Sequence, residues 1–173
     1  MKVIFLDVDG VLNSDKSLML DDALEDDLIL KLKTLVDKTG AKIILSSAWR
    51  FCFNPLRILM KYLDKYNLYL SGMTQNGVSI TWLKSQGYEP TTRFIDTRED
   101  INGNEYEVTT DRGAEIYKWL SNNPDVESFV IFDDEAFDIA RYFSNNFIKT
   151  NPRIGLTEEN IQQAEKILTK ATT

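Results

Sequence analysis

The chain has 173 residues, of which 43% are hydrophobic, and this length predicts one domain with a sizeable core. Its net charge of −7 argues against a broad basic surface for nucleic acid. With no histidine and one cysteine, imidazole catalysis, a His-ligated metal, an internal disulfide and a structural zinc site are excluded. There is neither a membrane-length apolar run nor a secretory signal, so we expect a cytoplasmic protein without membrane association whose chemistry depends on carboxylates.

The apolar run at residues 3–6 predicts a buried strand, and an Asp-Val-Asp-Gly sequence at 7–10 follows it directly. Side chains two residues apart point the same way in an extended chain, so Asp7 and Asp9 face the same space beyond the strand. These like charges repel each other unless a cation such as Mg²⁺ binds between them. A calcium loop fits less well, because two apolar residues follow where further acidic ligands are needed.

Strands and helices alternate along most of the remaining sequence. The patterns predict helices over 21–39, 55–66, 112–120 and 136–143 and from Thr157, and strands over 41–47, 68–70, 128–132 and 146–150. Between 71 and 111 the sequence fits helix, strand or hairpin equally well. We therefore predict a single α/β domain over 1–173, a three-layer Rossmann-like and mainly parallel sheet with helices on both faces and at most a small cap insertion near 71–111.

Polar residues end three of the predicted strands: Asp7 and Asp9, Ser46 and Ser47, and Asp133 and Asp134. In open parallel sheets ligands bind beyond the carboxyl ends of the strands, so these groups converge if the strands are neighbours. Four carboxylates around one cation suit phosphoryl transfer. Asp7 can attack phosphorus to give an aspartyl-phosphate, and Asp9 can exchange protons with the leaving oxygen and with water.

In these features the sequence resembles the haloacid dehalogenase-like phosphatases. Residues 7–11 resemble their first motif, Ser46 the second, and Asp133-Asp134 with Asp138 the fourth. The resemblance implies that Asp7 is the nucleophile, that Asp9 is the general acid and base, and that Ser46 donates a hydrogen bond to the phosphate. It also implies Mg²⁺ as the cofactor, bound by Asp9 through its backbone carbonyl and by three carboxylates: Asp7, Asp133 and Asp134.

The third motif of these phosphatases is a cation, for which we choose Arg112 as a further catalytic residue. Lys118 is the competitor, although its place in the middle of a predicted helix suits a solvated surface lysine. For Arg112 the alternative is a surface ion pair with Asp111 or Glu115.

Three runs are similar to the subgroup of these domains associated with RNA-repair proteins: residues 45–50, residues 112–120 with their Arg-Gly-Ala-Glu-Ile start, and residues 155–157. This resemblance implies a nucleotide or a polynucleotide end phosphate as substrate, with these candidate substrate-binding residues: Asn13, Ser47 and Arg50. Arg50 could grip a phosphate, and Asn13 could line the site or stabilise the turn. Trp49 could stack on a base or pack in the core.

The function expected from these features is a Mg²⁺-dependent phosphomonoesterase, with a phosphorylated small molecule or a nucleic-acid end as its partner. The alternative is a non-catalytic phosphate-binding or regulatory domain of the same fold. A phosphonate hydrolase would need a Schiff-base lysine that the sequence does not identify, and a haloacid hydrolase would not need Asp9 and a full metal site.

Overall fold

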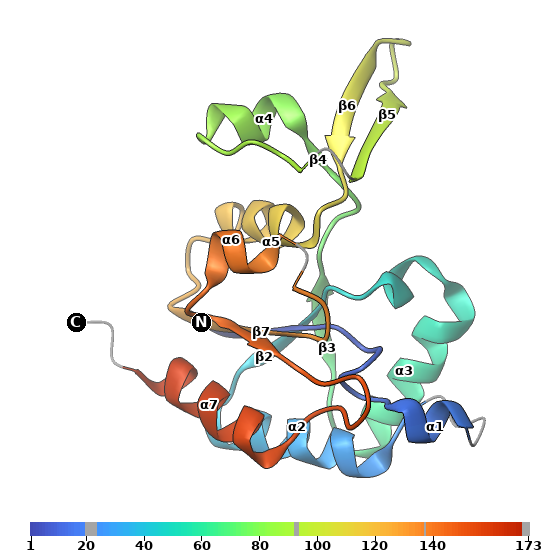
Figure 1. Ribbon diagram of the computed structural model, residues 1–173, viewed down its shortest axis with the longest axis vertical. Coiled ribbons are helices and arrows are strands. Elements are labelled where there is room, and N and C mark those ends of the chain that lie inside the picture. Colours follow the sequence, from blue (N-terminus) through green and yellow to red (C-terminus); the bar gives the residue numbers. More distant parts are fainter. Residues whose placement is uncertain (20–23, 92–93, 137, 171–173) are drawn as a thin grey trace. The chain divides into compact units, whose positions relative to one another are not determined.

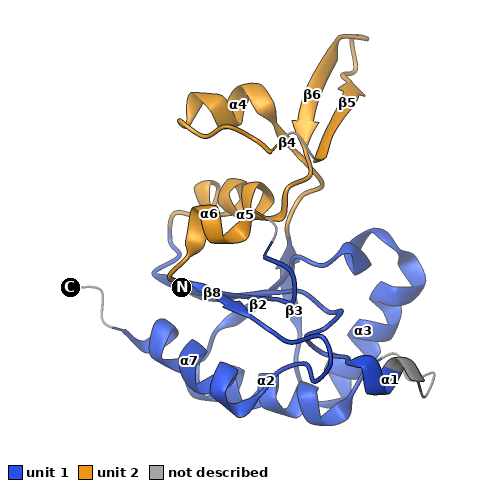
Figure 2. Cartoon of the chain, in the orientation of Figure 1, with its two compact units in different colours: residues 1–73, 125–136, 146–173 blue, residues 74–124, 137–145 orange. Residues whose placement is uncertain are grey.

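The computed structural model of the protein describes residues 1–19, 24–91, 94–136 and 138–170. The chain divides into two compact units, which Figure 2 distinguishes by colour. The first comprises residues 1–73, 125–136 and 146–173, and the second comprises residues 74–124 and 137–145.

The first unit is built on a sheet of five parallel strands in the order β3-β2-β1-β7-β8. These strands are β1 (Lys2–Leu6), β2 (Lys42–Leu45), β3 (Leu70–Met73), β7 (Ser128–Asp133) and β8 (Phe147–Lys149). The near-continuous apolar runs of β1, β2 and β7 suit strands that are buried on both faces. Leu6, the last residue of β1, is in register with Leu45 of β2 and Phe132 of β7. The carboxyl ends of the three central strands therefore meet at one edge of the sheet.

The helical elements of this unit are α1 (Asp15–Met19), α2 (Asp26–Thr39), the 3-10 helix η1 (Ala48–Phe51), α3 (Phe53–Lys65) and α7 (Glu158–Thr169). Figure 1 shows α2 and α7 side by side, and both bury apolar side chains in one core with alternate residues of the central strands. Gly40 ends α2 in the left-handed conformation, with φ 66°, and its N–H donates to the Val36 carbonyl. Thr157 and Asn160 form a capping box that begins α7.

The second unit contains a small antiparallel sheet in the order β4-β6-β5. Its elements are β4 (Val78–Ser79), α4 (Ile80–Ser85), β5 (Ile95–Glu99), β6 (Glu105–Thr109), α5 (Arg112–Ser121) and α6 (Ile139–Phe143). Aromatic rings supply much of its core, in which Tyr88 lies 4.9 Å from Tyr117 and 4.8 Å from Tyr142 between ring centroids.

The predicted fold class is confirmed, because the structure combines a five-strand parallel sheet with a small antiparallel insertion. All three strands of the insertion fall within residues 71–111, where the sequence had fitted several elements equally well. Helix α2 begins at Asp26 rather than residue 21, and positions 21–23 of that prediction lie outside the described residues, as does 137 in the helix predicted over 136–143. Within the described part of the chain, every helix is too short or too polar to span a bilayer.

Candidate active site

Three carboxylates come together where β1 and β7 end. Asp7 follows β1, and its backbone N–H donates to the Phe132 carbonyl at 3.0 Å. Asp133 is the last residue of β7, and Asp134 follows it. One oxygen from each of the three carboxylates lies within 4.8 Å of the others, although Asp133 is fully buried and Asp7 is only 7% exposed. The convergence predicted from the strand ends is thus present for these three residues.

The surroundings of this carboxylate cluster (Asp7, Asp133 and Asp134) favour a bound cation. Burial raises the pKa of Asp134 above its usual value, and the neighbouring charges of Asp7, Glu135 and Asp9 raise it further. Both effects disfavour negative charge at this place, and a divalent cation would offset them. The donor set consists of carboxylate oxygens, which are the ligands that Mg²⁺ prefers. The residues present therefore fit Mg²⁺.

The loop after β1 is fixed by backbone and side-chain hydrogen bonds. Gly10 adopts φ 67°, and its N–H donates to Asn13 Oδ1 at 2.8 Å. Thr150, which follows β8, donates from Oγ1 to the Gly10 carbonyl at 2.8 Å and from its N–H to the Asp133 carbonyl at 3.0 Å. Of the two roles considered for Asn13, the structure gives direct hydrogen bonds for the one that stabilises the turn, and its substrate-binding role stays a prediction.

Asp9 differs from the carboxylate cluster because it is exposed. Both of its oxygens accept hydrogen bonds, Oδ1 from Asn13 Nδ2 at 2.9 Å and Oδ2 from Trp49 Nε1 at 2.8 Å. The sequence carries no signal for the contact with Trp49, because its pattern indicates only a stacking face or a core position for this ring. Trp49 does pack against the hydrophobic core of the unit, and it also binds the carboxylate through its indole N–H.

In the segment after β2, one side-chain hydroxyl has no hydrogen-bond partner among the described residues, whereas two other side chains form hydrogen bonds within the segment. Ser46 is fully buried, and its Oγ has no hydrogen-bond partner among the described residues. The Ser46 N–H donates to the Leu6 carbonyl at 2.9 Å, which fixes the residue beside the end of β1. Ser47 Oγ caps η1, and Arg50 Nη1 donates to the Ser46 carbonyl at 2.7 Å. Ser46 is therefore the residue here whose side chain suits a ligand.

Arg112 and Lys118 both belong to α5 in the second unit, and they differ in their surroundings. Arg112 begins the helix and is half-buried. Lys118 Nζ lies 3.8 Å from the centre of the Trp82 ring, which is a cation-π contact. The N-terminus of α5 is held by Asp138, whose oxygens accept the N–H groups of Gly113 and Ala114 at 2.6 and 3.0 Å. These hydrogen bonds give Asp138 a structural role, and the choice of Arg112 as the catalytic cation stays a prediction.

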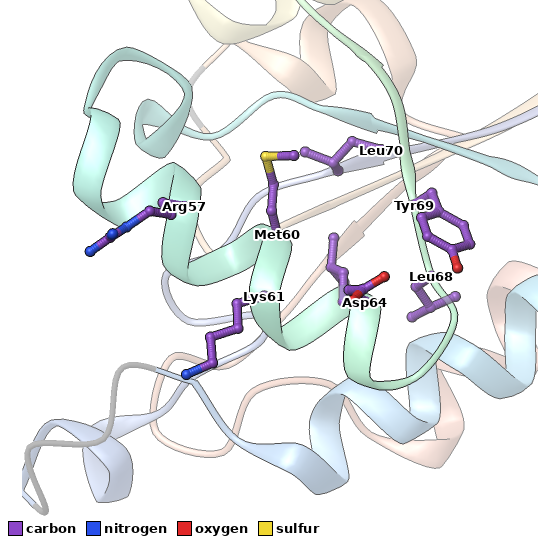
Figure 3. A pocket seen from close by; sticks show the side chains of 8 residues that line it. Arg57, Met60, Lys61, Asp64, Leu68, Tyr69 and Leu70 are labelled. Carbon is purple, nitrogen blue, oxygen red and sulfur yellow. The ribbon is translucent and has the colours of Figure 1, made fainter.

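A pocket of about 520 Å³ lies elsewhere in the first unit, between α3 and β3 (Figure 3). Figure 3 shows Met60 and Leu70 pointing toward each other, while Arg57 and Lys61 extend away. None of the predicted site residues lines this pocket. The carboxylate cluster, which is polar and lies at the strand ends, is therefore a separate feature.

Comparison with known families agrees with the geometry of the strand ends. Residues 3–161 match the family described as the HAD domain in Swiss Army Knife RNA repair proteins, where HAD stands for haloacid dehalogenase. Comparison with curated proteins and with solved structures found no match. The match covers most of the chain and confirms the resemblance seen in its motifs. With its parallel sheet and its cluster of buried aspartates, the chain belongs to this family of HAD domains of RNA repair proteins.

Proposed function

We propose that the protein is a Mg²⁺-dependent phosphomonoesterase that acts through an aspartyl-phosphate on Asp7. The observation that carries this proposal is the carboxylate cluster beside the buried Ser46 hydroxyl, which has no partner among the described residues. This combination offers oxygen ligands for a cation and a donor for a phosphate oxygen at the same strand ends. Membership of a HAD family, whose domains are typically phosphohydrolases, supports it.

Each step of the reaction is assigned to a side chain. Asp7 attacks phosphorus, so that an oxygen–phosphorus bond forms as the bond to the leaving oxygen breaks. Asp9 gives a proton to the leaving oxygen. It then takes a proton from the water that attacks the aspartyl-phosphate, and inorganic phosphate leaves while Asp7 is restored as a carboxylate. Mg²⁺, held by the carboxylates of Asp7, Asp133 and Asp134 and by the backbone carbonyl of Asp9, would neutralise the negative charge of the phosphate and the carboxylates.

The phosphate itself needs donors and a positive charge. Ser46 Oγ donates one hydrogen bond, which gives this buried hydroxyl the partner that it lacks among the described residues. Arg112 supplies the positive charge through its planar guanidinium. Ser47, Arg50 and Asn13 complete the predicted substrate-binding set, and their hydrogen bonds to the protein shape the segments that carry Ser46 and Asp9.

For the substrate we propose a nucleotide or a polynucleotide end phosphate. The support for this class is the family, which occurs in RNA repair proteins. The net charge of −7 favours a substrate that is held at its terminal phosphate over a long stretch of backbone bound to a basic surface.

The test is phosphate release from 3′- and 5′-phosphorylated oligonucleotides, mononucleotides and a generic aryl phosphate, each with Mg²⁺ or EDTA. We expect Mg²⁺-dependent release by the wild type and none by Asp7→Asn, which removes the nucleophile at nearly constant volume. Asp64→Asn, which changes an exposed carboxylate on α3, is the matched control and should retain full activity. Folded Asp7→Asn protein with undiminished release would refute the mechanism, and silence of the wild type would favour the non-catalytic phosphate-binding alternative.

A further inference from the structure

The Asp9 carboxylate is exposed, yet its two oxygens are each held by a different N–H donor. An exposed aspartate without such contacts samples several side-chain rotamers. We infer that Trp49 is a positioning residue that aims Asp9 at the leaving oxygen, an inference that rests on the proposed function. Trp49 acts through Asp9 and does not touch the reacting atoms.

The indole is well placed for this role because its own position is fixed. The backbone N–H of Trp49 donates to Ser47 Oγ at 3.3 Å, at the start of η1. The next residue, Arg50, ties η1 back to β2 through the Ser46 carbonyl. The ring is half-buried and packs against the core of the first unit. The indole N–H that donates to Asp9 is therefore held in place by these contacts of η1 and of the ring.

The hydrogen bonds leave Asp9 able to react. Each carboxylate oxygen has two lone pairs, and the N–H groups of Asn13 and Trp49 occupy one on each oxygen. One lone pair on each oxygen stays available for the proton that Asp9 delivers and later accepts. A proton donor held within hydrogen-bond reach of the leaving oxygen gains from orientation, and small misplacements cost large factors in rate.

The first arm of the test is Trp49→Phe, which keeps an aromatic ring in the core and removes the N–H donor. An alkyl phosphate needs protonation of its leaving oxygen, whereas 4-nitrophenyl phosphate has a leaving group that is stable as an anion. We expect kcat/KM to fall about tenfold or more for the alkyl ester and less than about twofold for the nitrophenyl ester. Trp82→Phe, which changes an indole in the aromatic core of the second unit, is the control and should change neither value.

The second arm is a double-mutant cycle with Asp9→Asn, measured in single turnovers with phenyl phosphate. If Trp49 acts only through Asp9, adding Trp49→Phe to Asp9→Asn should change the rate less than about twofold. If the wild type is active and Trp49→Phe loses the same factor in rate on both esters, the inference is overturned and the proposed function stands. A further loss of rate in the double variant, relative to Asp9→Asn, would have the same meaning. A wild type that is silent on every ester overturns both.

A third arm does not depend on activity. The chain has three tryptophans, so it gives three indole N–H resonances, and the one absent in Trp49→Phe belongs to Trp49. Because Asp9 accepts from this group, the Trp49 indole N–H should exchange with solvent several-fold faster in Asp9→Ala than in the wild type. Unchanged exchange would show that the hydrogen bond does not persist in solution, and it would overturn the inference.

Discussion

Gly10 and Asp134 lie so close together that a side chain at residue 10 has no room. A Cβ built on Gly10 would come within 2.6 Å of Asp134 Cβ, and Gly10 also has φ +67°, which L residues rarely adopt. The turn after β1 is thus pressed directly against the aspartate that follows β7. The position of Asp134, which is a candidate metal ligand, therefore depends on the absence of a side chain at residue 10.

Gly10→Ala should therefore destabilise the protein and displace Asp134. We expect a loss of roughly 1–3 kcal/mol in the free energy of unfolding from urea titration, together with weaker Mg²⁺ binding. Gly40→Ala is the matched control, because Gly40 has φ +66° and nothing within 4 Å of its added Cβ. Equal losses in the two variants would mean that the contact with Asp134 adds nothing to the backbone strain.

Ser46 and Ser47 should respond to alanine substitution in opposite ways. Ser46→Ala removes a buried hydroxyl without a partner among the described residues, so its free energy of unfolding should stay the same or rise, while phosphate turnover falls. Ser47→Ala removes the side-chain cap of η1 and should cost about 1 kcal/mol with a smaller effect on turnover. Urea unfolding and phosphate release on the same preparations provide the comparison, and a destabilised Ser46→Ala would contradict the assignment of its hydroxyl to a ligand.

Mg²⁺ should stabilise the folded protein through the carboxylate cluster. At a free concentration 100 times Kd, the free energy of unfolding should rise by about 2.7 kcal/mol over that in EDTA. Asp134→Asn should be more stable than the wild type in EDTA, because it removes a charge that burial and Asp7 disfavour, and it should gain less from Mg²⁺. Ser46→Ala should keep the Mg²⁺ response of the wild type, and identical Mg²⁺ titrations for the two variants would refute this ranking.

Asp138 should make stability depend on pH. Burial raises the pKa of Asp138 to about 6, the charge of Asp111 adds to this, and the N–H groups of Gly113 and Ala114 oppose it. Because the folded protein binds this proton more tightly than the unfolded chain, the stabilisation is complete below about pH 4 and is lost as the pH rises through about 6. Its size is at most about 3 kcal/mol.

Asp138→Asn isolates this contribution. The amide cannot titrate, and it offers one oxygen to the two N–H groups where the protonated carboxyl offers two, so the variant should be less stable than the wild type at low pH. The difference in the free energy of unfolding should shrink between about pH 4.5 and pH 7 in urea titrations. A difference that stays constant over this interval would show that Asp138 does not titrate there.

Arg112→Ala and Lys118→Ala test which residue supplies the positive charge for the phosphate. Lys118 rests on the Trp82 ring, so its loss should lower stability slightly and leave turnover within about twofold of the wild type. Arg112→Ala should lower kcat/KM for the preferred phosphate ester by about 100-fold, because under the proposed assignment it removes the positive charge that stabilises the transferring phosphoryl group. The reverse ranking would move the assignment to Lys118.

The sequence predicts the central sheet and the carboxylate cluster well because both depend on local patterns. The apolar runs of β1, β2 and β7 each lead directly into polar residues, and neighbouring parallel strands bring those residues together. Strands β5 and β6 gave no such signal, because most of their residues are exposed, β5 has no apolar alternation, and the alternation in β6 is limited to Tyr106 and Val108. Trp49 could not be recognised as a partner of Asp9, because that contact spans 40 residues and follows from how η1 turns back after β2.

The hydrogen bonds from Thr150 bear on the order in which the loop after β1 is assembled. Thr150 Oγ1 reaches the Gly10 carbonyl across 140 residues, and the Leu156 N–H reaches the Val11 carbonyl at 3.0 Å. The turn after Asp9 is synthesised first, but these two donors follow only about 140 residues later in the chain. A nascent chain that stops before Thr150 carries Asp7 and Asp9 without these two contacts to the turn that follows Asp9. The loop that carries Asp9 therefore has all of these contacts only when the segment after β8 closes over the segment after β1.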